Sequence, residues 1–161
     1  QYLVASTGGN GSQYVVVGSN AGVGSLVVRG GVFTGYTGGI FLNGVNATRM
    51  LVDGAKITAS DPNNASTSLG TYRSVNSVVT NNTITETSGA AGAQAIVFDA
   101  QGVAFNTNCG QVTGNRIVVS GNTKPWNSVD GYHVFVANTY TGATAPVSAV
   151  NDEVAHNINI P

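Results

Sequence analysis

The chain has 161 residues; 42% of them are hydrophobic, only 8% are charged, and the formal net charge is −1. This length suits one domain with a real core, but so few charges leave solubility to Asn, Ser, Thr and 22 Gly, a neutral surface that favours self-association. The balance of charge disfavours a nucleic-acid partner and an anionic membrane surface, and no apolar run is long enough to be inserted in a membrane.

The elements predicted in chain order are all short strands. Residues 1–24 are expected to form leading strands between Gly-rich turns, and residues 25–120 to form regular strand units. Two polar segments, Ala59–Gly70 and Gly121–Gly131, are predicted to be surface loops. No stretch has helical periodicity. The chain is therefore predicted to be a single all-β domain that ends, over residues 121–161, in a loop and an irregular capping tail.

A six-residue pattern is repeated along residues 25–120. It reads V-T-N-N-T-I at 79–84 and V-T-G-N-R-I at 112–117, with looser copies beginning at Val27 and Val52. Asn and Gly tolerate the left-handed backbone of a sharp corner between two strands, and the flanking aliphatic residues are expected to point inward. Repeats of roughly 20–30 residues made of short strands are typical of a solenoid. A β-sandwich also has many short strands, but it would not place Asn or Gly at the same corner in successive copies.

VTNNTI and VTGNRI resemble the rungs of the right-handed parallel β-helix, the pectate-lyase-like fold shared by polysaccharide lyases, pectinases and bacteriophage tailspikes. The resemblance covers roughly residues 25–120 and implies a solenoid of about four rungs. In that family the corner Asn side chains stack along the helix and bond to neighbouring backbone. By motif position Asn82 and Asn115 correspond to this corner, whereas Gly30 and Ala55 depart from it, so the expected ladder contains two Asn residues.

Catalytic residues are harder to identify. The resemblance implies acidic residues on an outer face, and glycoside hydrolysis needs two carboxylates. Asp99 and Glu86 are the candidates, because they could approach each other across rungs, although both are expected to be surface acids. The two His residues have no Cys or acid at ligand spacing, so no metal and no cofactor is expected. The single cysteine, Cys109, is expected to be a small buried thiol. Enzymatic activity is left uncertain, with the balance against it.

The predicted loop 121–131 and the residues just after it hold the clearest binding candidates. Trp126, Asn127, Asp130 and Tyr132 would offer aromatic rings to the C–H face of a sugar, and amide and carboxylate groups to its hydroxyls. Two other roles for Trp126 stay open. It could fold back to cap an open end of the solenoid, which is the favoured role because such ends must be covered, or it could be a hot spot for a protein partner.

The function expected from the resemblance is that of a bacteriophage tailspike or tail-appendage fragment, on a virion or outside the cell, that attaches to a host-surface polysaccharide. Tailspikes are homotrimers, and a trimer would bury neutral faces and multiply weak contacts. One alternative is a structural subunit of an extracellular filament or shell, in which Gln1–Val17 or Val154–Pro161 extends to complete a neighbour's sheet. The other is a polysaccharide lyase or hydrolase of the same fold.

Overall fold

The computed structural model describes residues 16–17, 26–36, 40–43, 49–60, 67–72, 76–99, 109–129, 132–149 and 151–161. Every regular element in these residues is a β-strand, and every strand pair is parallel. The predicted all-β class is confirmed. Among the described residues there is no helix long and apolar enough to cross a membrane.

The strands form three parallel sheets. Sheet A consists of β1 (Val16–Val17), β4 (Ile40–Asn43), β7 (Thr67–Tyr72), β10 (Gln94–Asp99) and β13 (Lys124–Ser128). Sheet B consists of β2 (Leu26–Arg29), β5 (Met50–Asp53), β8 (Ser77–Thr80), β11 (Cys109–Thr113), β14 (Tyr132–Val136) and β16 (Glu153–Ala155). Sheet C consists of β3 (Val32–Tyr36), β6 (Lys56–Ser60), β9 (Thr83–Glu86), β12 (Arg116–Val119), β15 (Thr139–Tyr140) and β17 (Ile158–Asn159).

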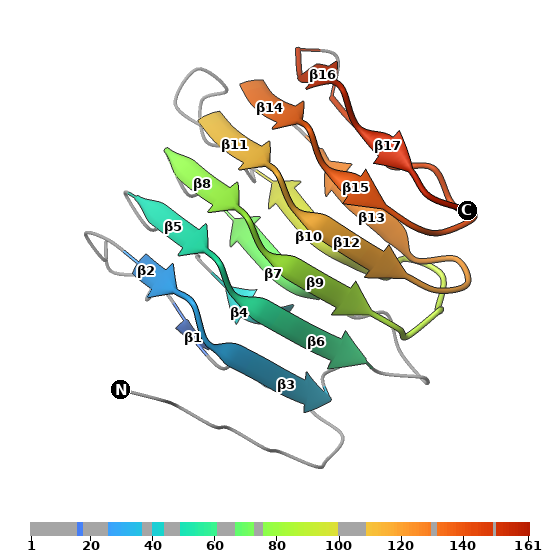
Figure 1. The fold of residues 1–161 in the computed structure, drawn as a ribbon, viewed down its shortest axis with the longest axis horizontal. Helices are drawn as coiled ribbons and strands as arrows, with labels where there is room; N and C mark the ends of the chain where they lie inside the picture. The colour runs from blue at the N-terminus through green and yellow to red at the C-terminus, as the bar shows by residue number, and fades with distance from the viewer. Residues whose placement is uncertain are drawn as a thin grey trace.

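The chain visits the sheets in the order A, B, C and then moves up one strand spacing, so that each of the first five rungs contains one strand of each sheet, and the sixth contains β16 and β17 alone among the described strands. Figure 1 shows sheets B and C side by side in one layer, with sheet A behind them. This arrangement is compatible with a β-solenoid, and we call it the stack. Two of its sheets have six strands, so the expected number of four rungs is too low.

The expected irregular tail over residues 121–161 is wrong. Strands β13 to β17 extend the same three sheets in register, as when Trp126 pairs with Ile96 and Phe135 with Val112. The predicted loops are wrong in part, because Thr67–Gly70 belongs to β7 and Lys124–Ser128 is β13. Residues 121–123 do form a turn, and residues 61–66 and 130–131 lie outside the described residues. The segment Val154–Pro161 does not extend away either, since β16 pairs with β14 and β17 with β15.

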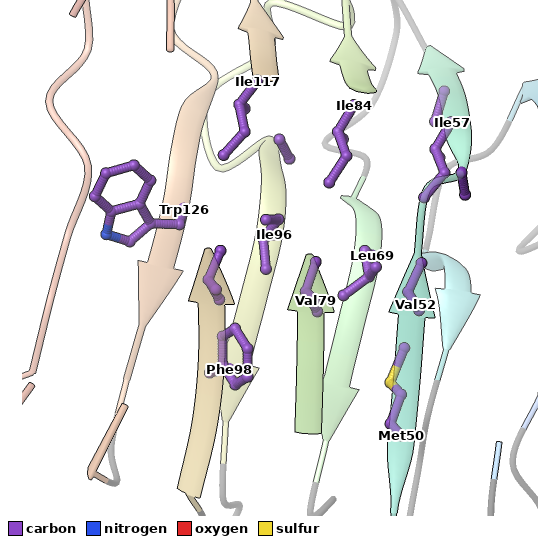
Figure 2. Close-up of a cluster of buried hydrophobic side chains, with 14 of the residues drawn as sticks. Met50, Val52, Ile57, Leu69, Val79, Ile84, Ile96, Phe98, Ile117 and Trp126 are labelled. Atoms are coloured by element: carbon purple, nitrogen blue, oxygen red, sulfur yellow. The ribbon is translucent and has the colours of Figure 1, made fainter. Parts of the chain in front are cut away.

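The core lies between the two layers and is built by alternation. In β5 and β6 every second residue is buried while its neighbours face outward, as a strand with one covered face requires. The strand register then places side chains of the same kind above one another in successive rungs. One inward column of sheet B consists of Val28, Val52, Val79, Val112 and Phe135. Facing them are Ile57, Ile84 and Ile117 of sheet C and Leu69, Ile96 and Trp126 of sheet A (Figure 2).

The rung made of β13, β14 and β15 fills the core with aromatic rings, one from each sheet. The Trp126 indole stacks on Phe135 with ring centroids 5.1 Å apart and meets Tyr140 edge-on at 5.3 Å. Its N–H donates to Ser148 Oγ at 3.1 Å. Three rings replace the aliphatic side chains of the rungs before it, so this layer closes the apolar core near its C-terminal end.

The corner between sheets B and C begins in the same backbone conformation in all six rungs. Its first residue has a positive φ each time: Gly30, Gly54, Asn81, Gly114, Ala137 and His156, between 55° and 66°. The next residue is Asn in the last four rungs, namely Asn82, Asn115, Asn138 and Asn157. The ladder therefore contains four Asn residues and not two.

The Asn side chains link each rung to both of its neighbours. Asn115 Oδ1 accepts from the backbone N–H and the Nδ2 of Asn82, each at 2.9 Å. Its own Nδ2 donates to Val79 O and to Asn138 Oδ1, again at 2.9 Å. Asn138 repeats this pattern with Asn157. Because these amides are buried, the ladder satisfies backbone groups that strand pairing leaves open at the corner.

Candidate functional site

The two acidic candidates lie apart. Glu86 is fully buried at the end of β9, where Ser68 Oγ donates to its Oε2 at 3.0 Å and the Ser88 N–H donates to its Oε1 at 3.1 Å. Register places Ser68 beside Ala95, and Asp99 lies four residues further along β10, about 13 Å away. Glu86 thus holds the turn from sheet C to sheet A, and the expectation that it is a surface acid approaching Asp99 is wrong.

The four predicted carbohydrate-binding residues do not form one surface. Trp126 is 0% exposed within the aromatic layer, so its ring has no face open to a sugar and the predicted glycan contact through it is wrong. Asn127 is half-buried in sheet A, where its backbone pairs with Val97 and bridges to Val147. Tyr132 is 48% exposed at the start of β14. Asp130 lies outside the described residues.

Other reactive groups form no site of their own in the described part of the chain. No group of three or more His, Cys, Asp or Glu is placed there to hold a metal ion. His133 is buried against Phe98, with ring centroids 4.4 Å apart, and its backbone N–H donates to Asp152 Oδ1 at 3.0 Å. His133 and Asp152 therefore help to build the end of the stack.

Sheets B and C have open outer faces, whereas the outward residues of β7 and β10 in sheet A are buried. In β7 and β10 the residues that alternate with the core are buried as well, including Ser68, Ala95 and Val97. In β6, β9 and β12 the alternating residues are exposed or half-buried. A partner of the described stack can therefore reach regular rows of side chains on two sheets.

The outer face of sheet C consists of two such rows. The first row is Val32, Lys56, Thr83, Arg116, Thr139 and Ile158. The second row contains Thr34, Thr58, Thr85 and Val118. Neighbouring residues in a row are about 4.8 Å apart, and the two rows are about 7 Å apart. Five hydroxyl groups and two cations thus form a polar array in the middle of the outer face of sheet C. We call this outer face the threonine face.

The outer face of sheet B has a different composition. One of its rows is apolar over most of its length: it runs through Val27, Leu51, Val78, Gln111 and Val134 and ends at the exposed Glu153. Val27 is 51% exposed and the other aliphatic members are half-buried. The neighbouring row is polar, and there the hydroxyls of Thr80 and Thr113 bond to each other at 3.1 Å. We call the first of these the aliphatic row.

Sequence reasoning missed the threonine face, although the repeat contained a signal for it. In three copies of the pattern the position after the corner residue was treated as free, yet it is occupied by Lys56, Thr83 and Arg116. In the copy beginning at Val27 that position is Gly31, because Val28 and not Val27 pairs with Val52 in the structure. Since a strand alternates its side chains, a free position next to an inward Ile must face outward. Equal spacing in each copy then places these residues in one row.

Comparison with known proteins gives no relative for this chain. No protein-family model matches it, and neither the curated proteins nor the solved structures contain a match.

Proposed function

We propose that the chain is a right-handed parallel β-helix module of a virion or extracellular appendage, like a bacteriophage tailspike, that attaches to a surface polysaccharide. Two observations and one general rule support this. The sheets are parallel and stacked, connections between parallel strands in one sheet are nearly always right-handed, and the corner Asn residues form a ladder of the kind that the resemblance implies.

The observation that carries the proposal is the threonine face. Its hydroxyls are fixed by the sheet at even spacing, so little conformational entropy is lost when they bind a ligand. A linear polysaccharide lying along the rows presents hydroxyl groups at regular intervals too. Each contact is weak, but repeated contacts on a rigid surface add up to useful affinity.

Binding to polysaccharides tests the proposal directly. The chain is applied to an array of immobilised bacterial polysaccharides, and we expect retention on at least one of them. A variant with Thr83→Val and Thr85→Val removes two hydroxyls from the threonine face at nearly constant shape and should lower retention. The matched control, Thr80→Val with Thr113→Val, removes two hydroxyls from sheet B and should not. Retention on no polysaccharide overturns the proposed function, and equal losses in both variants remove the threonine face from it.

We further propose that the module acts as a homotrimer with the aliphatic row buried between copies. Support comes from the low charge of the chain and from the exposed Val27 in that row. Light scattering over a concentration series should give a constant trimer mass, and Val78→Lys should lower it. A monomer at every concentration contradicts this part of the proposal.

A filament subunit is the second candidate, and the last rung favours it. Val154 stands in an inward position yet is 49% exposed, because within the described residues no strand covers β16 and β17 on their far side. An open parallel edge invites a further strand. This candidate predicts fibres in electron micrographs, where the spike predicts separate particles. The enzyme alternative is weakened, because Glu86 and Asp99 lie apart.

A further inference from the structure

The threonine face contains positive charge without negative charge. Lys56 and Arg116 are both exposed, and they stand in the same row with Thr83 between them. Two strand spacings separate them, about 10 Å. Within the described part of sheet C, the only carboxylate is that of Glu86, which is buried on the inner side.

Neither cation is paired with an acid in the described part of the chain. The side chains of Lys56 and Arg116 have no hydrogen bond or ion pair with any residue that the structure describes. The acid nearest to Lys56 along the chain is Asp53, but it belongs to sheet B, and its Oδ1 accepts from Asn81 Nδ2 at 3.2 Å. Both charges on the threonine face are therefore available to a ligand.

We propose that the threonine face binds an acidic polysaccharide whose chain runs along the rows. This inference rests on the proposed function and adds the class of glycan. Carboxylate or sulfate groups on alternate sugars would recur at about the interval between Lys56 and Arg116, and the sugar hydroxyls between them would meet the Thr rows. Arg116 can pair with such an anion through two parallel N–H groups, whereas Lys56 acts as a point charge.

Charge density separates this ligand from nucleic acid. A duplex carries one negative charge for every ~1.7 Å of its axis, and specific binding proteins neutralise roughly six to ten phosphates. The threonine face offers two cations on a chain of net charge −1. Its hydroxyl rows add partners for an uncharged polyol and contribute little against a dense polyanion. A polymer with sparse charges and many hydroxyl groups fits better.

The test measures dissociation constants of the full chain for hyaluronan, alginate and chondroitin sulfate, with dextran as the uncharged reference. We expect at least one acidic polymer to bind more tightly than dextran and to lose affinity between 50 and 200 mM salt, because added salt screens the two ion pairs. The variant Lys56→Gln with Arg116→Gln should weaken this binding about tenfold or more.

The matched control changes net charge equally on the other face. Arg29 and Arg49 are exposed on, or immediately before, strands of sheet B, so Arg29→Gln with Arg49→Gln should change the affinity less than about twofold. Equal weakening by both variants would mean that only net charge matters and would overturn the inference. Equal binding of dextran would also overturn the inference, but it would leave the proposed function standing. Full competition by a DNA oligonucleotide would overturn the inference as well. Binding of no polysaccharide at all refutes the function as well.

Discussion

Asn115 is the residue on which the stability of the corner depends most. Its side chain is 1% exposed and bonds to the rung on either side. In Asn115→Ala two donors of the buried Asn82 lose their acceptor, Asn115 Oδ1. They are the backbone N–H of Asn82 and one hydrogen of its Nδ2. An orphaned buried donor costs about 1–3 kcal/mol. We therefore expect the free energy of unfolding to fall by about 2–4 kcal/mol.

Urea unfolding followed by far-ultraviolet circular dichroism measures this, with an unchanged m value showing that only stability has changed. The control is Asn81→Gly one position earlier, because Asn81 is exposed, has a φ of 56° that Gly adopts freely, and bonds only at the surface. It should shift stability by less than about 0.5 kcal/mol. Asn157→Ala, half-buried at the open end, should cost about 1–2 kcal/mol. If Asn115→Ala costs no more than Asn81→Gly, the ladder does not stabilise the stack.

Three further substitutions test the core and the corner. Trp126→Ala should lower the free energy of unfolding by about 3–5 kcal/mol. In the native chain the fluorescence of this single Trp should resist quenching by iodide, and easy quenching would contradict its burial. In Gly110→Ala the new Cβ would clash with the Phe98 ring and lie 2.8 Å from His133 Nδ1, so we expect a loss of about 1–3 kcal/mol; an unchanged urea midpoint would show that the rings move freely. Ala137→Gly should raise stability by about 0.5–1 kcal/mol because Ala137 has a φ of 55°; a lower midpoint would refute the strain argument.

The corner was predictable where the repeat was strict. Asn82 and Asn115 are followed, two residues later, by Ile84 and Ile117, and this made the pattern visible. Asn138 was not predicted to be a corner residue, because Tyr140 occupies the position that Ile has in the pattern. That substitution is possible because the fifth rung fills its core with rings, and Tyr140 meets Trp126 edge-on. A pattern built on aliphatic layers cannot find an aromatic one.

The strand β13 was not predictable from local composition. Lys124–Ser128 contains Pro125, Asn127 and Ser128, which are turn formers, so the segment was predicted to be a loop. It is a strand because the fifth rung places this segment beside β10, and Trp126 then extends the column that contains Leu69 and Ile96. Packing against a distant segment outweighed the local preference. The same reason explains why Leu69 was missed within Thr67–Gly70.

The candidate site consists of outward positions, whose residue types the repeat does not specify. This follows from how the stack folds. Inward residues and corner amides decide whether one rung fits the next, so they recur in the sequence. Outward residues such as Thr83 touch only neighbours in their own row and can change at little cost to the fold. The chain has six Lys and Arg residues in all, and two of them, Lys56 and Arg116, stand in one row without a carboxylate among its described residues. In a chain so poor in charge, attraction over long distances is weak, and recognition must come from contact along the row itself. A rigid face that repeats its contacts suits a ligand that repeats as well, which is why we place a polymer there.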